Sequence, residues 1–319
     1  GKKMSVNQNQ EQRKQVLDFM TSAHQTFSSD KGGANASYIP YLASVPSDLF
    51  GIAISFPDGQ VLEVGDTKYE FAIESISKVF TLAKVLEEIG KDKFLATIGS
   101  DATGEPFNSV IALELHKEHP SNPFDNAGAI ATVSLLNAKS ADDRWNQIIS
   151  TYSLFAGRDL TVNEEVYKSE SDTNAHNRGI SWLLKNSGKM FTDPDQACDV
   201  YTRQCSVAIT CRDLAIMGGT IANHGVNPVT KKQVISRENV QPILAEMAMN
   251  GLYDNTGTWL YNTGLPGKSG VGGGEVAIVP GVCALAVFAP PLDVFGNSVK
   301  GQKVGAFLSE KLGWSLLNK

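Results

Sequence analysis

Strand-like apolar runs lie mainly near the two ends of this chain, and the long stretch between them contains few of them and is helical in character. Apolar residues on both sides of the turn Pro57-Asp58-Gly59 predict a hairpin over residues 48–64. A second hairpin is predicted over residues 275–288, on both sides of Pro280-Gly281. These strands can bury their apolar faces only in a shared sheet, so we expect the two ends of the chain to meet.

This order of elements predicts an α+β fold, in which an antiparallel sheet is flanked by terminal helices and an all-helical lobe is inserted. The spacing of apolar residues predicts the terminal helices at 14–27 and 302–317. The helix-like segments of the inserted lobe are 79–89, 128–137, 144–155, 178–184, 208–223 and 239–249.

The same pattern predicts two lobes. We expect an α/β lobe made of residues 14–70 and 260–319, and a helical lobe of residues 71–259. The polar residues 1–13 are expected to be disordered, with Gly1-Lys2-Lys3 a cloning remnant ahead of Met4.

The charge balance limits the partners that the chain can have. Its 28 Lys and Arg residues against 34 Asp and Glu give a net charge of −6, whereas nucleic acids and anionic membranes require clustered excess Lys and Arg. No apolar stretch reaches the roughly 20 residues of a membrane span, and we find no signal peptide. We expect a cytoplasmic protein with no nucleic-acid or membrane partner.

Neither the cysteines nor the histidines have the spacing of a metal site. Cys198, Cys205, Cys211 and Cys283 form no C-x-x-C pair, and no H-E-x-x-H occurs. We expect ordinary thiols, no metal and no cofactor.

One candidate for chemistry is the S-x-x-K motif Ser75-Ile76-Ser77-Lys78. Residues three apart lie on one face of a helix, and an apolar helix begins at this match. Ser75 in the first turn would be favoured as an alkoxide by free N–H groups and the helix dipole. Lys78 could take the serine proton if burial lowers its pKa. The motif alone is weak, because Ser28 to Lys31 also matches it in a polar loop.

A second candidate is the glycine-rich segment of residues 264–274, which contains Lys268-Ser269-Gly270. A P-loop is excluded, because the required glycine is replaced by Asn262 and a strand follows instead of a helix. K-S-G instead resembles the K-[ST]-G element of serine β-lactamases and penicillin-binding proteins. A backbone N–H beside such glycines can supply half of an oxyanion hole.

Together, an early S-x-x-K, a late K-S-G and an inserted helical lobe fit the β-lactamase/transpeptidase-like fold. The S-D-N element of that superfamily is absent, and Tyr253-Asp254-Asn255 has only a Y-x-N form. No G-x-S-x-G occurs, so the α/β-hydrolase pattern is absent.

From about residue 14 onward the chain resembles the bacterial serine-dependent glutaminases of that superfamily. The segments that carry this resemblance are Tyr38-Ile39-Pro40, Glu74-Ser75-Ile76-Ser77-Lys78-Val79, Glu105-Pro106-Phe107-Asn108-Ser109, Asn126-Ala127-Gly128-Ala129-Ile130, Asn174-Ala175-His176-Asn177-Arg178, Tyr201-Thr202-Arg203-Gln204-Cys205-Ser206, residues 264–274, Pro290-Pro291-Leu292-Asp293 and Gly296-Asn297-Ser298-Val299.

The resemblance implies hydrolysis of L-glutamine to L-glutamate and ammonia, without a cofactor, through a γ-glutamyl ester on a serine. It implies that Ser75 is the nucleophile, that Lys78 is its base, and that backbone N–H groups of Ser75 and Val271 hold the oxyanion. Tyr201 and Tyr253 match active-site tyrosines, one of which relays a proton to the leaving amine. The implied substrate-binding residues are Tyr38, Ser75, Asn126, Glu170, Asn177, Tyr201, Tyr253 and Val271. Since relatives assemble as dimers or tetramers, the resemblance also implies a homo-dimer or homo-tetramer.

Elementary chemistry agrees with these roles, because the ammonium and carboxylate of free glutamine both need partners when desolvated. Glu170 can accept from the ammonium, and the amides of Asn126 and Asn177 can donate to the carboxylate. From the residues alone, Glu170 would usually be a solvated acid and the two amides turn or cap residues, so these roles depend on the resemblance. The role of Lys268, in electrostatics or in structure, stays open.

Two other functions share part of the pattern. A β-lactamase or penicillin-binding acyltransferase would use the same S-x-x-K and K-S-G elements, but the missing S-D-N counts against it. A non-catalytic amino-acid sensor would keep the pocket, but the complete pair of Ser75 and Lys78 counts against it.

Overall fold

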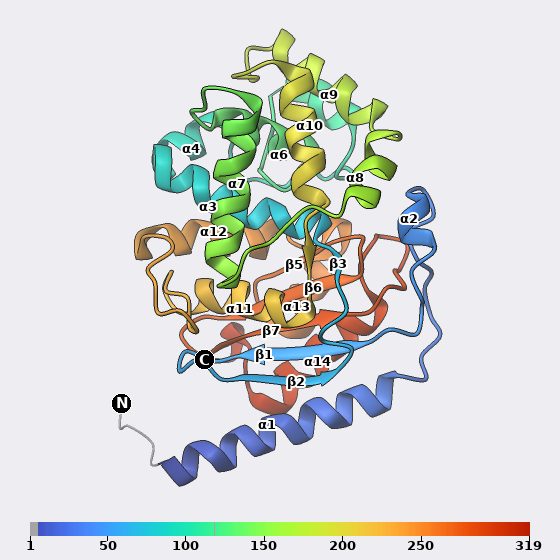
Figure 1. Ribbon diagram of the computed structural model, residues 1–319, viewed down its shortest axis with the longest axis vertical. Coiled ribbons are helices and arrows are strands. Elements are labelled where there is room, and N and C mark those ends of the chain that lie inside the picture. Colours follow the sequence, from blue (N-terminus) through green and yellow to red (C-terminus); the bar gives the residue numbers. More distant parts are fainter. Residues whose placement is uncertain (1–5, 118) are drawn as a thin grey trace.

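The computed structural model describes residues 6–117 and 119–319, and within them the two ends of the chain share one sheet. Figure 1 shows the strands from both ends lying side by side. All neighbours are antiparallel, in the order β2 (Val61–Gly65), β1 (Gly51–Ser55), β7 (Cys283–Phe288), β6 (Gly274–Val279) and β5 (Gly267–Ser269). The expected antiparallel sheet and both hairpins are confirmed, and β5 is an additional strand.

Helices cover both faces of this sheet. Below it in Figure 1, α1 (Val6–Phe27) packs against α14 (Val299–Leu312), and the two helices bury an apolar layer against the sheet. On the opposite face, α11 (Cys211–Ala222) contacts β1, β6 and β7. That close approach requires glycine, because a Cβ at Gly219 would lie 2.2 Å from Ser55 Oγ.

Both terminal helices differ from the expected bounds. Residues 6–13, expected to be disordered, form the first turns of α1, while residues 1–5 lie outside the described part. Arg13 fixes this end, because its guanidinium donates to Asp58 and Gln60 and covers the ring of Phe56. At the other end, α14 stops at Leu312 and not at residue 317, because Gly313 caps it with a φ of +64°.

The remaining helices gather mainly at the other end of the molecule (Figure 1). They are α2 (Pro40–Ala43), α3 (Ser77–Ile89), α4 (Lys91–Thr97), α5 (Val110–Leu115), α6 (Asn126–Leu135), α7 (Ala141–Ala156), α8 (Glu164–Ser171), α9 (Ala175–Asn186), α10 (Pro194–Cys205), α12 (Val240–Asn250) and α13 (Thr256–Thr263). The expected segment 208–223 divides into β4 (Ala208–Ile209) and α11. We therefore propose that α11 belongs to the α/β lobe, whereas the lobe bounds expected from the sequence (71–259) place it in the helical lobe.

The layer that contains the five-stranded sheet and the layer of remaining helices meet at a small second sheet. In this second sheet, β3 (Phe71–Ala72) pairs with β4. From β3 the chain runs into a 3₁₀ turn, η1 (Glu74–Ile76), and then into α3, most of whose residues are buried. The loop between β5 and β6 lies against the same turn, so residues from both layers face one pocket.

Candidate active site

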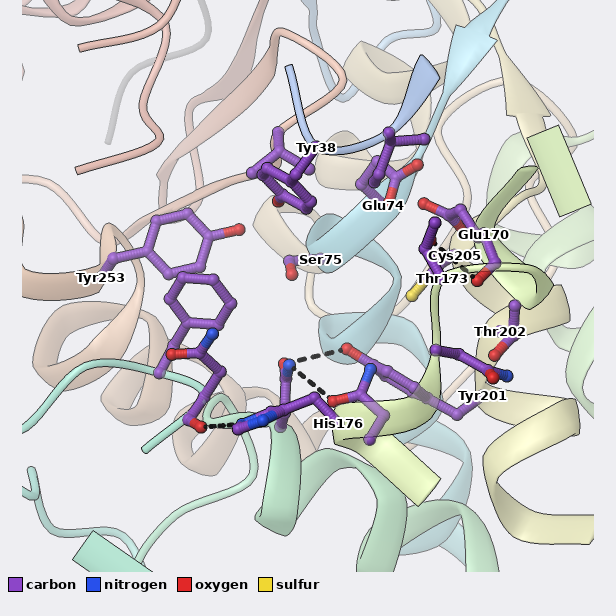
Figure 2. A pocket seen from close by; sticks show the side chains of 17 residues that line it. Tyr38, Glu74, Ser75, Glu170, Thr173, His176, Tyr201, Thr202, Cys205 and Tyr253 are labelled. Atoms are coloured by element: carbon purple, nitrogen blue, oxygen red, sulfur yellow. Dashed lines mark hydrogen bonds between the residues drawn. The ribbon is translucent and has the colours of Figure 1, made fainter. Parts of the chain in front are cut away.

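A pocket of about 270 Å³ opens where the sheet layer and the helices meet. Figure 2 shows the side chains that line it. All of the substrate-binding residues predicted from the sequence lie on its wall: Tyr38, Ser75, Asn126, Glu170, Asn177, Tyr201, Tyr253 and Val271. They come from separate elements, so the pocket exists only in the folded chain.

Ser75 lies in η1, immediately before α3. The residue before it, Glu74, has a φ of +52°, and this left-handed conformation is disfavoured for residues with a side chain. Ser75 is 8% exposed and lines the pocket. Its N–H belongs to the first turn of a helix and has no acceptor inside that helix. The chain thus presents a hydroxyl and a free N–H at one point.

Lys78 follows one turn later, buried beneath the pocket wall. Its Nζ donates to the carbonyl oxygen of Phe124 and to Oδ1 of Asn126, both at 2.9 Å. Burial lowers the pKa of Lys78 to about 8, although nearby acidic groups oppose the shift. A neutral amine has two N–H groups and one lone pair, so these two bonds leave the lone pair free.

The described residues contain no hydrogen bond between Lys78 Nζ and Ser75 Oγ. Catalytic hydrogen bonds commonly tighten only when a substrate is bound.

Asn126 connects several of the predicted site residues. Its Oδ1 accepts from the hydroxyl of Tyr201 at 3.2 Å as well as from Lys78, and its Nδ2 donates to Oδ1 of Asn177 at 3.1 Å. Asn126 occupies the first position of α6, next to the N-cap Asp125, whose side chain accepts from Gly128. The rigid start of a helix therefore fixes the amide at the centre of this network.

Val271 lines the same pocket as Ser75, because the glycine loop lies directly on the backbone that precedes Ser75. A Cβ at Gly272 would lie 2.3 Å from the carbonyl oxygen of Ala72, and one at Gly270 would lie 2.9 Å from that of Ile73. Any larger residue would push the loop away. In the described part of the chain, the N–H of Val271 donates to no backbone or side-chain acceptor.

Tyr253 completes the wall beside Ser75, and Figure 2 shows its hydroxyl pointing toward the serine. That hydroxyl interacts with the side chain of Ser75 and has no other hydrogen-bond partner among the described residues. Burial raises the pKa of Tyr253, so the hydroxyl keeps its proton. Phe107 packs against the ring at 4.7 Å, and the amine of Lys268 lies 4.6 Å from its centre.

Lys268 stands behind Tyr253 and does not line the pocket. It is fully buried, and its Nζ donates to the carbonyl oxygen of Ser269 at 2.6 Å. Burial and the nearby charge of Lys78 lower the pKa of Lys268 well below its ordinary value. Its contact with the ring of Tyr253 connects it to the pocket wall.

Two acidic residues occupy the opposite wall. Glu170 is 8% exposed, and its Oε2 accepts from Ser206 Oγ at 3.0 Å. Glu74 lies beside it and is 4% exposed (Figure 2). Tyr38, which is 59% exposed, lies at the mouth of the pocket.

Sequence reasoning gave no role to several residues of the wall: Ile39, Glu74, Phe107, Asn108, Thr173, Asn174, His176, Thr202 and Cys205. Most of them lie in the segments that carry the family resemblance, and their position in those segments is the signal that could have identified them. Among them, His176 Nε2 lies 2.6 Å from the carbonyl oxygen of Asn108, which ties α9 to the loop before α5.

The described residues contain no group of three or more side chains suited to hold a metal ion. In the same part of the chain, no helix is both long enough and apolar enough to cross a bilayer.

An α+β fold with a serine in a helical turn, a buried lysine one turn on and a glycine loop opposite defines a β-lactamase-like protein. Comparison with known proteins narrows this class. The family model described as Glutaminase matches residues 33–317. A glutaminase of Mycobacterium ulcerans (strain Agy99) is 53% identical over 305 residues, which cover 96% of this chain and 94% of that protein. The chain therefore belongs to the glutaminase family of hydrolases, and the resemblance seen in the sequence is confirmed.

Solved structures agree with this assignment. A structure described as probable glutaminase ybaS has a TM-score of 0.95 and 49% identity, and the match covers 99% of this chain and 100% of that one. A covalent complex of the Bacillus subtilis glutaminase YbgJ with 5-oxo-L-norleucine, formed by reaction with 6-diazo-5-oxo-L-norleucine, has a TM-score of 0.83 and 28% identity over 95% of this chain and 98% of that one.

Proposed function

We propose that this member of the glutaminase family hydrolyses the side-chain amide of L-glutamine, giving L-glutamate and ammonia, through an ester on Ser75 and without a cofactor. The observation that carries the proposal is the buried amine of Lys78, which lies one helical turn after a pocket serine and whose pKa is lowered to about 8. An amine in this state is partly neutral near physiological pH and can accept the serine proton.

In the first half of the reaction, Ser75 Oγ attacks the amide carbon of glutamine while its proton passes to Nζ of Lys78. The carbonyl oxygen becomes an oxyanion, which the N–H groups of Ser75 and Val271 stabilise. Collapse of this intermediate breaks the C–N bond, and the nitrogen takes a proton as ammonia leaves. Tyr253 is the better placed of the two tyrosines to relay that proton, because its hydroxyl points at the serine, whereas that of Tyr201 donates to Asn126.

In the second half, a water attacks the ester carbon. Lys78, neutral again, takes a proton from that water, and the same N–H groups hold the second oxyanion. Breakage of the ester bond returns the proton to Ser75 and releases L-glutamate. The covalent complex of the Bacillus subtilis glutaminase with a reactive ketone supports covalent catalysis in this family.

The opposite walls of the pocket suit the two charges of a free amino acid. Glu170 would accept from the α-ammonium group, while Asn126, Asn177 and Tyr201 would donate to the α-carboxylate. Tyr38 at the mouth would cover the bound substrate. A pocket that pairs both charged groups should reject amides that lack either of them.

The test is release of ammonia from L-glutamine by the purified protein. Ser75→Ala should reduce kcat by about 10³-fold or more while L-glutamine still binds. Lys78→Ala should behave in the same way. Binding of L-glutamine without turnover by the unsubstituted protein would instead identify a sensor. Nitrocefin hydrolysis without ammonia release would identify a β-lactamase.

Two further features belong to this proposal. A cytoplasmic location is part of the proposal and would be checked by cell fractionation. Assembly into a homo-dimer or homo-tetramer is supported by exposed apolar side chains such as Ile111 and Leu115 on α5. Light scattering at micromolar concentration would decide it, and a monomer there would contradict it.

A further inference from the structure

Glu74 is a pocket residue to which the mechanism above gives no task. Its carboxyl group is buried, its φ is positive, and its Oε1 has no hydrogen-bond partner among the described residues. A disfavoured backbone conformation and an unsatisfied buried oxygen both oppose folding, and such features are typical of functional sites.

The carboxyl group of Glu74 interacts with that of Glu170, on the same wall of the pocket (Figure 2). Two buried carboxyl groups in contact cannot both be ionised, and a hydrogen bond between them requires one proton. Glu170 is the better anion of the two, because Ser206 already donates to its Oε2.

The surroundings place the proton on Glu74. Burial, and then the negative charge of Glu170, raise the pKa of Glu74 well above its ordinary value. Burial also raises the pKa of Glu170, but its hydrogen bonds with Glu74 and Ser206 oppose that shift. The titratable groups that interact with the pair are Lys78 from α3, Tyr201 and Cys205 from α10, Tyr253 from the segment before α13, and Tyr38 before α2.

We propose that Glu74 is a positioning residue for the ammonium subsite: its protonated carboxyl group donates a hydrogen bond to Glu170 and holds that carboxylate toward the α-ammonium group of a free amino acid. The pair then carries one negative charge, which matches the single positive charge of the ammonium group. A second negative charge beside Ser75 would also oppose the oxyanion formed there. The inference rests on the proposed function, because that function assigns Glu170 to the ammonium group.

A merely structural role must be separated from this one. The side chain of Glu74 also touches the glycine loop, since a Cβ at Gly272 would lie 3.4 Å from its Cγ. Loss of that contact would displace the oxyanion hole and affect every ligand alike. Loss of the hydrogen bond to Glu170 would affect only ligands that carry an α-ammonium group.

The experiment therefore compares two ligands, L-glutamine and glutaramate, which is glutamine without its α-amino group. Their Kd values are measured by calorimetry in the Ser75→Ala background, so that neither ligand is consumed. That parent should prefer L-glutamine by about 100-fold or more, because glutaramate leaves Glu170 unpaired. Glu74→Met is then added, because methionine keeps the length of the side chain but has no hydrogen-bond donor. It should reduce the preference for L-glutamine to below about tenfold, because only the binding of L-glutamine becomes weaker.

Two further variants complete the comparison. Glu74→Gln retains a donor toward Glu170 and should keep the preference of the parent. Glu246→Gln, a matched change at another buried carboxyl group outside the pocket, should leave both Kd values within about twofold. The proposal would be overturned if Glu74→Met weakened the binding of both ligands equally, or if the preference for L-glutamine did not change.

If Glu74→Met does not fold, infrared spectroscopy keeps the proposal testable. At pH 8, the spectrum of the unsubstituted protein minus that of Glu74→Gln should contain the carbonyl-stretch band of a protonated carboxylic acid. Absence of that band would show that Glu74 is ionised and would overturn the proposal. Failure of the proposed function shows separately, because the unsubstituted protein would then release no ammonia from L-glutamine.

Discussion

Nζ of Lys78 lies 2.9 Å from Oδ1 of Asn126, and this hydrogen bond connects the proposed base to the wall of the substrate pocket. The same Asn126 side chain bonds to Tyr201 and Asn177. The protonation state of the lysine and the arrangement of the substrate-binding groups are therefore linked through one amide. A change at this amide should appear both in binding and in the pH dependence of turnover.

Asn126→Asp should slow turnover at neutral pH and move the pH profile upward. A carboxylate beside Lys78 favours the ammonium form and typically raises the pKa of such a neighbour by about 1–3, so kcat at pH 7 should fall by about tenfold or more. The measurement is kcat between pH 6 and pH 10. Asn163→Asp is the control, because it adds the same charge at the N-cap of α8, where aspartate also caps well. An inflection at the same pH in Asn126→Asp and in the unsubstituted enzyme would contradict this link.

For the unsubstituted enzyme, kcat/KM should rise by about tenfold per pH unit below pH 8 and level off above it, because the pKa of Lys78 is about 8. The rate rises with pH because the ammonium form of Lys78, which dominates at lower pH, has no lone pair to accept the serine proton. Glutamate should be quantified after quenching, so that no coupling enzyme adds its own pH dependence. A flat profile between pH 6 and pH 8 would argue against Lys78 as the base.

Gly272→Ala should reduce kcat by about 10²–10³-fold, the usual cost of removing one oxyanion-hole donor. The new Cβ would lie 2.3 Å from the carbonyl oxygen of Ala72, so the loop that carries Val271 must move. Gly179→Ala in α9 is the matched control, since its Cβ would meet nothing within 4 Å. The control should keep full activity and gain about 0.5–1 kcal/mol of stability from helix propensity. Unchanged kcat in Gly272→Ala would remove this loop from the mechanism.

Phe288→Ala should lower the free energy of unfolding by about 3–5 kcal/mol. The ring of Phe288 is fully buried at the end of β7, and it stacks on Phe71 at 4.3 Å and on Tyr69 at 5.7 Å. Its loss would leave a cavity under β3, which leads into the turn of Ser75. Urea unfolding followed by circular dichroism measures the effect. Val282→Ala, at an exposed position of the β6–β7 turn, should change the free energy by less than about 0.5 kcal/mol.

Much of the architecture could be predicted from the sequence because it depends on local periodicity. The apolar runs on both sides of Pro57-Asp58-Gly59 and of Pro280-Gly281 identified the hairpins, and their shared need for burial predicted that they join one sheet. The three residues of β5 are too few for any period to be visible. For α11, the helical period was clear but its location was not, because the contact of Gly219 with Ser55 joins positions far apart in the chain.

The candidate site also contains some residues that the sequence could predict from a local pattern and others that it could not. Ser75 and Lys78 were visible as a motif because one helix holds both of them. Glu170, Asn177 and Tyr253 could be placed only through the family resemblance, since no local pattern relates them to the serine. Glu74 stands next to Ser75 in sequence, yet its importance depends on a neighbour from α8 that sequence spacing does not reveal.

The pairing of β1 with β7 also has a consequence for biosynthesis. Gly51 of β1 pairs with Phe288 of β7, so one flank of β1 stays without its neighbour until nearly the whole polypeptide has left the ribosome. The helices between them can form earlier, because their contacts are more local. The nucleophile is therefore translated long before the loop that faces it, and a nascent chain cannot process substrate before its final strands have joined the sheet.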